Sequence, residues 1–186
     1  MSISIDRVLD DHINTVKKIS SIKDNIEKSG YLIIEALKNG NKVLIAGNGG
    51  SAGDAQHFSA ELTGRFLKER VSLPGIALTT DTSALTAIAN DYGYDDVFSR
   101  QLSGLGNAGD VFVGITTSGN SESINKAVKH CLSSNIKSIG LLGRDGGDSV
   151  NLVDCPVLVS SDNTANIQEC HILIIHIWCM MIDEAF

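Results

Sequence analysis

Short hydroxyl side chains gather directly after an apolar run, in an arrangement that could bind a phosphate group. The run 110–114 leads into Ile115-Thr-Thr-Ser-Gly-Asn-Ser-Glu-Ser123, and a segment of helical period follows. A helix that starts there would offer free backbone N–H groups and the positive end of its dipole to an anion. The hydroxyl donors beside it are Thr116, Thr117, Ser118, Ser121 and Ser123. No Gly-Lys-Ser/Thr follows, which disfavours a Walker-type nucleotide loop, and a Ser/Thr-rich turn with a helix cap is the alternative.

A second loop of the same kind is Gly47-Asn48-Gly49-Gly50-Ser51, again between an apolar run and a helical pattern. Glycines permit positive φ and let a ligand approach the backbone closely. The spacing is not Gly-x-Gly-x-x-Gly, and no acidic residue ends the next strand as a ribose-binding position would. A small sugar or phosphate is therefore favoured over a dinucleotide, with a plain tight turn as the alternative.

The helix expected after this loop carries acidic and basic side chains on one face. Asp54, His57, Glu61 and Arg65 recur at spacings of three and four residues. His57 and Glu61 have the i,i+4 spacing at which two side chains can share a metal ion. A solvated surface stripe is the alternative interpretation.

Gln168, His171 and His176 lie in an apolar helical pattern near the C-terminus. A buried histidine among isoleucines needs a hydrogen-bond partner or a ligand. A structural histidine is one explanation, and a site shared with the acidic and basic helix is the other.

These segments belong to an alternation of strands and helices. We expect strands at 42–46, 75–78, 110–115, 138–142 and 156–159, and helices at 5–22, 25–39, 52–66, 83–90, 97–105, 121–134 and 165–184. Strands rich in Val, Ile and Leu without polar alternation are typical of parallel strands covered on both faces. The sequence thus predicts a doubly wound α/β fold with a mainly parallel five-stranded sheet flanked by helices. We expect one domain over 1–186, with N-terminal helices in 1–40 and the α/β core and C-terminal helix in 41–186.

Composition narrows the class of partner. The 186 residues carry a formal net charge of −7 and no basic block, which disfavours nucleic acid and anionic membranes as partners. Cys131, Cys155, Cys170 and Cys179 form no C-x-x-C pair, which favours buried, reduced thiols over a disulfide or zinc framework. The N-terminus has no basic region followed by an apolar core, so we expect a cytoplasmic protein without a signal peptide.

The apolar residues of the last helix wrap most of its circumference, so it must be covered on more than one side. We expect a second subunit to supply part of that cover, with the N-terminal helices contributing to the interface. A central helix within one subunit is the alternative.

Taken together, these motifs resemble the SIS (sugar isomerase) fold and, within it, the phosphoheptose isomerases. The resemblance runs from about Lys42 to Ile182. It rests on the following segments: Ala46-Gly-Asn-Gly-Gly-Ser51, Asp54-Ala-Gln-His-Phe-Ser-Ala-Glu-Leu-Thr-Gly-Arg-Phe66, Ala89-Asn-Asp-Tyr-Gly93, Phe98-Ser-Arg100, Gly114-Ile-Thr-Thr-Ser-Gly-Asn-Ser121 and Ile167-Gln-Glu-Cys-His171. The chain departs from the family's pattern at Ala52-Gly53, where relatives often carry a bulkier pair, and at Thr116, where they often carry serine.

The resemblance implies a set of site residues. It makes Glu61 and His176 the acid/base pair, and in some members a zinc ion is held by residues matching His57, Glu61, Gln168 and His176. The residues it places at the substrate and its phosphate are Asn48, Gly49, Gly50, Ser51, Arg65, Asn90, Asp91, Thr116, Thr117, Ser118, Ser121 and Gln168. It also implies a cytoplasmic homotetramer with active sites at subunit interfaces.

The implied reaction is the conversion of sedoheptulose 7-phosphate to D-glycero-D-manno-heptose 7-phosphate through an enediol. This is the first step of nucleotide-activated heptose biosynthesis, which supplies lipopolysaccharide or capsule. A non-catalytic SIS adaptor that binds the replication initiator is one alternative, but such proteins typically lack residues matching Glu61 and His176. An isomerase of another phosphosugar and a sugar-phosphate-sensing regulatory domain are the others.

Overall fold

The computed structural model describes residues 3–186, and a parallel five-stranded sheet runs through their centre. Its order is β2-β1-β3-β4-β5, and all four neighbouring pairs are parallel. The strands are β1 (Val43–Gly47), β2 (Gly75–Ala77), β3 (Val111–Thr116), β4 (Lys137–Gly143) and β5 (Cys155–Val159). The predicted fold class is confirmed, and each predicted strand is present within a few residues of its expected bounds.

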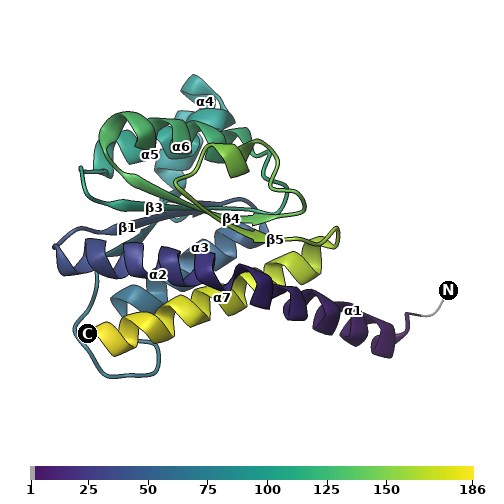
Figure 1. Cartoon of the computed structure of the whole chain (residues 1–186). Coiled ribbons are helices and arrows are strands. Elements are labelled where there is room, and N and C mark those ends of the chain that lie inside the picture. The colour runs from purple at the N-terminus through teal and green to yellow at the C-terminus, as the bar shows by residue number, and fades with distance from the viewer. Residues whose placement is uncertain (1–2) are drawn as a thin grey trace.

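Helices cover both faces of the sheet (Figure 1). One layer contains α4 (Thr82–Tyr92), α5 (Val97–Leu105) and α6 (Glu122–Ser134). The other contains α1 (Ile5–Lys18), α2 (Lys23–Lys38), α3 (Gly50–Thr63) and α7 (Thr164–Ala185). Short 3-10 turns lie at Ile19–Ile22 (η1), Tyr94–Asp96 (η2) and Asp148–Asn151 (η3). Successive side chains of β1 point to opposite faces of the sheet, so each helix layer packs on every second residue. Val43 and Ile45 belong to one hydrophobic cluster, and Leu44 and Ala46 belong to the other.

The order of the strands creates a crevice between β1 and β3. β1 pairs with β2 on one side and with β3 on the other, and Gly47 at the end of β1 pairs with Ile115 near the end of β3. The helix after β1 lies on one face of the sheet and the helix after β3 lies on the other. Ligands of open α/β sheets bind at such a switch point, beyond the carboxyl ends of the strands. The two loops singled out from the sequence lie side by side there.

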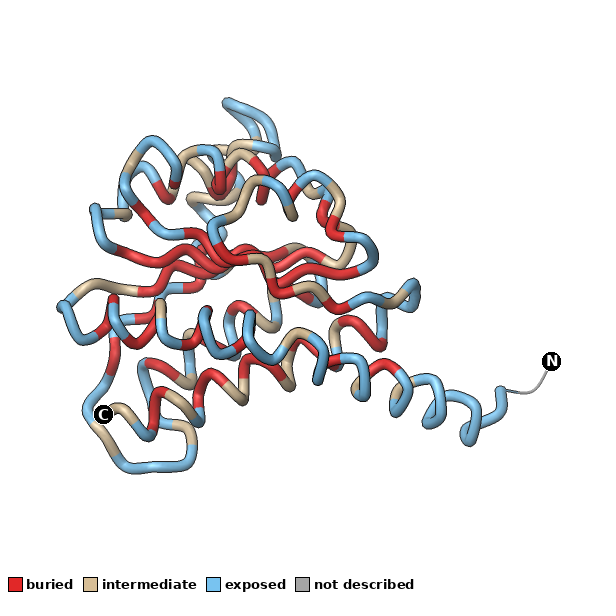
Figure 2. Tube along the Cα trace, in the orientation of Figure 1, coloured by how far each residue is buried: buried red, intermediate tan, exposed pale blue. Residues whose placement is uncertain are grey.

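About half of the last helix is buried within the chain itself. Trp178 on α7 is fully buried and its indole N–H donates to the carbonyl of Ile26 on α2 at 3.0 Å. By length and mean hydropathy α7 could cross a membrane, but half of that stretch is buried inside the protein, as in the core helix of a globular domain. An apolar edge remains accessible at Met180, which is 41% exposed, and the outer side of α1 is exposed along its length (Figure 2). Cover by a second subunit stays a prediction.

All four cysteines are free and buried, as expected. Burial raises the pKa of the Cys131 and Cys179 thiols to about 12, so both stay protonated and inert at neutral pH.

Candidate active site

Asn48 joins the two loops of the crevice. Its amide N–H donates to the hydroxyl of Ser123 at 3.1 Å, and its carbonyl oxygen accepts from the Tyr94 hydroxyl at 2.7 Å. Ser123 lies in the first turn of α6, whereas Asn48 precedes Gly49, the N-cap of α3. The two helix N-termini are therefore held next to one another, and both offer backbone N–H groups to the same space.

The hydroxyl loop after β3 is organised by its own side chains. The Thr116 hydroxyl lies 3.2 Å from that of Ser121 and accepts the N–H of Gly119, also at 3.2 Å. Ser118 accepts the N–H of Asn120 at 3.2 Å. Gly119 has a φ of +68°, and a Cβ there would collide with the backbone of Gly146, so this turn requires glycine.

The start of α3 is equally open to an anion. Its N-cap is Gly49, which has a φ of +58° and no side chain with which to cap the helix. Ser51, in the first turn, is 3% exposed. Backbone N–H groups and dipole at this N-terminus favour a bound negative charge.

Three side chains from two distant segments meet beside these loops. Nε2 of His57 on α3 lies 3.0 Å from Oε1 of Glu61 and 3.3 Å from Nε2 of His176 on α7. Phe66 stacks on the His176 ring, with centroids 5.3 Å apart and an interplanar angle of 22°. The structure thus places the carboxylate and the imidazole suggested as acid/base pair around one common neighbour.

Gln168 connects this cluster to the glycine-rich loop. It lies two turns before His176 on α7, and its amide fills the space that a Cβ on Gly50 would occupy. Glycine at position 50 is therefore what allows α7 to approach the start of α3. Gln168 and His176 therefore both bring α7 against α3, the first at Gly50 and the second at His57.

Asp54 lies one turn before His57 and is half-buried. One of its carboxylate oxygens is buried and has no hydrogen-bond partner within residues 3–186. Burial raises the pKa of this carboxyl to about 6, against the opposing effect of nearby His57. A carboxyl that titrates close to neutral pH is typical of functional sites. The sequence had placed Asp54 on the polar face of the helix without giving it a role.

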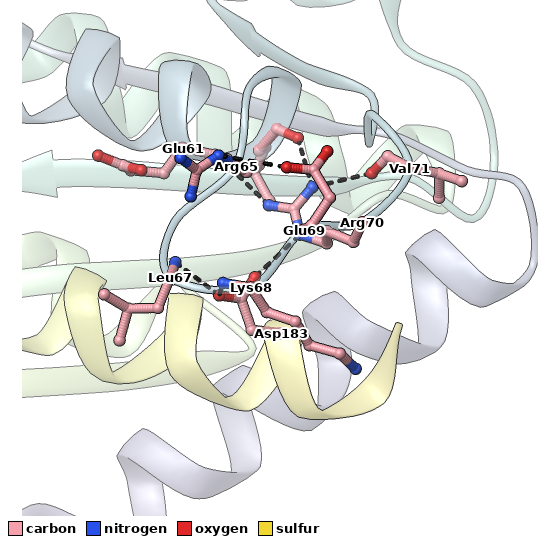
Figure 3. Close-up of polar contacts among 9 residues, drawn as sticks. Glu61, Arg65, Leu67, Lys68, Glu69, Arg70, Val71 and Asp183 are labelled. Atoms are coloured by element: carbon pink, nitrogen blue, oxygen red, sulfur yellow. Dashed lines mark hydrogen bonds and ion pairs between the residues drawn. The ribbon is translucent and has the colours of Figure 1, made fainter.

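Three of the expected substrate residues pair with other side chains and not with this cluster. The Arg65 side chain is exposed and pairs with Glu69 at 3.4 Å, on the segment that follows α3 (Figure 3). Asn90 and Asp91 are exposed at the end of α4 and are hydrogen-bonded to one another at 2.8 Å. Both sites face outward from this subunit, so their roles at the substrate stay predictions.

Sequence reasoning missed two side chains that shape the site. Tyr94 orients Asn48 and Phe66 orients His176, but neither lies at a periodic position that would have suggested a role. Phe66 did belong to a segment of the family resemblance, and that was the only signal for it.

The donor set is of the type that binds zinc. Two ligand atoms about 2.1 Å from a tetrahedral zinc ion lie about 3.4 Å apart, close to the 3.0 and 3.3 Å spacings around His57 Nε2. His57 and Glu61 are thus spaced to bind one ion together, and so are His57 and His176. Within residues 3–186, however, no three His, Cys, Asp or Glu side chains are already gathered as a metal centre.

Comparison with known proteins identifies the family of the chain. The SIS domain model matches residues 9–143. A phosphoheptose isomerase from Aliarcobacter butzleri is 55% identical over 174 residues, covering 93% of this chain and 92% of the relative. Another, from Campylobacter jejuni, is 52% identical over 182 residues and covers 98% of both chains. The chain therefore belongs to the SIS domain family.

Solved structures narrow the assignment. A phosphoheptose isomerase from Neisseria gonorrhoeae superposes with a TM-score of 0.92 at 44% identity, covering 97% of both chains. One from Francisella tularensis gives 0.93 at 40% identity, covering 97% of this chain and 96% of the other. Within the SIS domain family, the chain belongs to the phosphoheptose isomerases.

Proposed function

We propose that this protein is an isomerase that converts sedoheptulose 7-phosphate to D-glycero-D-manno-heptose 7-phosphate. The observation that carries the proposal is the convergence of Glu61 and His176 on His57, beside two helix N-termini suited to a phosphate. Phosphoheptose isomerases more than 50% identical to this chain support the choice of a seven-carbon substrate.

The reaction moves one proton between adjacent carbons and one between their oxygens. Glu61 takes the proton from C1 of the ketose and returns it to C2 of the enediol. His176 transfers the hydroxyl proton of O1 to O2, which converts the C2 ketone into an alcohol and leaves an aldehyde at C1. His57 contacts both side chains and holds them in a common orientation.

The loops at the crevice act on the other end of the substrate. Ser51, Thr116 and the α6 N-terminus grip the phosphate, with Thr117, Ser118 and Ser121 as further donors. Anchoring this remote group turns its binding energy into orientation at C1 and C2. Asn48 is placed between phosphate and sugar by its bonds to Tyr94 and Ser123.

Zinc is part of the proposal. His57, Glu61, Gln168 and His176 would hold the ion, and a zinc ion bound there supplies Lewis-acid polarisation of the sugar oxygens. The pairwise spacings around His57 support three of these donors, namely His57, Glu61 and His176.

We further propose a cytoplasmic homotetramer in which neighbouring subunits complete the sites. The exposed apolar residues of α1 and Met180 on α7 provide surface for such contacts. Arg65, Asn90 and Asp91, exposed on one subunit, would then meet the substrate of another.

The test is a direct assay with the purified protein. It is incubated with sedoheptulose 7-phosphate, with added zinc or with a chelator, and the aldoheptose phosphate is followed by NMR. Pentulose and hexulose phosphates serve as matched substrates of shorter chain. Turnover of the heptose alone supports the proposal, preference for a shorter sugar corrects the substrate, and inactivity with zinc on all three favours the adaptor alternative.

A further inference from the structure

A buried ion pair joins the two helices that carry the acid/base residues. Arg70 lies on the segment between α3 and β2, and its Nε lies 3.0 Å from Oδ1 of Asp183 on α7 (Figure 3). The side chains of Arg70 and Asp183 are 1% and 7% exposed. Neither residue touches the crevice, and the reaction described above uses neither.

Arg70 holds the last turn of α3. Its Nη2 donates to the carbonyl of Glu61 at 2.6 Å, and its Nη1 donates to the carbonyls of Leu62 and Val71, both at 3.0 Å. The last carbonyls of a helix have no partner within the helix, and a cation there is stabilised by the helix dipole. The guanidinium therefore fixes the backbone of the residue proposed as the carbon base.

Asp183, the other member of the pair, binds the backbone of the segment that follows α3. Its Oδ2 accepts the backbone N–H groups of Leu67 and Lys68, both at 2.8 Å. Burial alone would raise the pKa of Asp183, but these two N–H groups and the Arg70 guanidinium outweigh it and hold the pKa below its usual range. The carboxylate is thus ionised and fully hydrogen-bonded.

The position of Asp183 on α7 links it to His176. It follows His176 by seven residues, which is two helical turns, so both project from the same face. Cys179 lies between them, and burial together with the Glu61 and Asp183 carboxylates raises the pKa of its thiol to about 12.

We propose that Arg70 and Asp183 are positioning residues, which set the register of α3 against α7 and so the approach of Glu61 to His176. The inference rests on the proposed isomerase function. A guanidinium fork binds with defined geometry, whereas buried ion pairs contribute little net stability. Misplacing reacting groups by about 1 Å can cost about a hundredfold in rate.

The experiment compares Arg70→Lys and Asp183→Asn with a matched control at Asp110, which directly precedes the central strand β3. Asp110 is 1% exposed, pairs with Lys42 at 2.7 Å and accepts the N–H groups of Lys42 and Asn107. Asp110→Asn therefore removes an equally buried, similarly bonded carboxylate far from the crevice. We expect kcat to fall at least tenfold in both test variants with KM changed less than threefold. Asp110→Asn keeps the wild-type kcat while losing a comparable amount of Tm.

A second readout does not depend on turnover. The imidazole signals of His57 and His176 are recorded by NMR in metal-free, histidine-labelled protein. Shifts of both in Arg70→Lys, but not in Asp110→Asn, support the positioning role even where the wild-type protein fails to isomerise the heptose, which would refute only the proposed function. Arg70→Lys keeps the cation and is the deciding variant where Asp183→Asn does not fold. Wild-type kcat and unshifted signals in Arg70→Lys, or an equal loss of kcat in Asp110→Asn, would overturn the inference.

Discussion

The two ends of the candidate site are built in different ways. The hydroxyl loop at the phosphate end is local, because Thr116 and Ser121 lie five residues apart on it, and only its bond to Asn48 comes from the neighbouring strand. The acid/base end is assembled over distance, since His57 and His176 are 119 residues apart in the chain. A short motif can specify the first, whereas only the packing of α3 against α7 can specify the second.

The two ends of the site also differ in burial, with the phosphate end more buried than the acid/base end. Ser51 and Thr116 are each 3% exposed, while the side chains of His57 and Glu61 are 45% and 21% exposed. Donors fixed in a dry loop are organised before the ligand arrives, and they lose little freedom on binding it. The acid/base end lies open in a single subunit, which is consistent with a site that a neighbouring subunit closes.

The largest effect is expected at the acid/base end. Glu61→Gln keeps the shape of the side chain and a contact to His57, but it removes the carboxylate that takes the carbon proton. Removing a general base typically lowers a rate by about 10²–10⁴, so we expect turnover of sedoheptulose 7-phosphate to fall by about a thousandfold. Protection of the protein against heat by the substrate should persist, because the phosphate loops are intact. The measurements are kcat and the substrate-dependent shift in Tm.

Glu69→Gln, an exposed carboxylate eight residues further on, provides the control for loss of charge near this end. Wild-type rates in Glu61→Gln would remove Glu61 from the mechanism. Loss of heat protection along with turnover would instead mean that the two ends are not separable.

A smaller effect is expected at the phosphate end. Thr116→Val preserves shape but removes the hydroxyl that accepts the Gly119 N–H and faces Ser121. Loss of one such hydrogen bond costs about 1–3 kcal/mol, so we expect KM to rise about tenfold with a smaller change in kcat. Thr116→Ser keeps the hydroxyl and should remain within a factor of two of wild type. A kcat defect as large as that of Glu61→Gln would show that the loop does more than bind.

The features that the sequence predicted are those encoded locally. Apolar runs without alternation identified the strands, and glycines and hydroxyls directly after two of them located the crevice. Glu61 and His57 share a helix face, so their contact follows from i,i+4 spacing alone. The residues alone left the meeting of His176 with them as one of two alternatives, and the family resemblance chose it, because periodicity says nothing about which helices pack together.

Arg70 and Asp183 show why other contacts could not be predicted from the sequence. Arg70 lies in a segment without regular structure, and Asp183 looks like a polar residue at the end of an apolar helix. Their pairing depends on the path of the chain from α3 to β2, which no local sequence pattern predicts.

The helix predicted at 52–66 ends instead at Thr63. The Gly64 backbone turns there, and the Arg70 guanidinium donates to the last carbonyls of the helix.

The smallest expected effect concerns a second histidine of α7, which contrasts with half-buried His176. His171 is fully buried, and its Nε2 lies 3.0 Å from the carbonyl oxygen of Leu142 at the end of β4. Burial lowers the pKa of His171 to about 4, against the hydrogen bond to Leu142, so the folded protein holds it neutral. In the unfolded chain it protonates near pH 6.5, so the folded state loses stability as pH falls from 6.5 toward 4.

This loss amounts to at most about 1.4 kcal/mol per pH unit for one group. The variant His171→Gln carries an amide that does not titrate, so its Tm should fall less than that of wild type between pH 6.5 and about pH 5. The variant His130→Gln, which makes the same substitution at a half-buried histidine on α6, is measured alongside. Equal slopes in all three proteins would assign the acid sensitivity to other groups. They would also mean that burial does not distinguish His171, which packs inside the protein, from His176, which is proposed to meet the substrate.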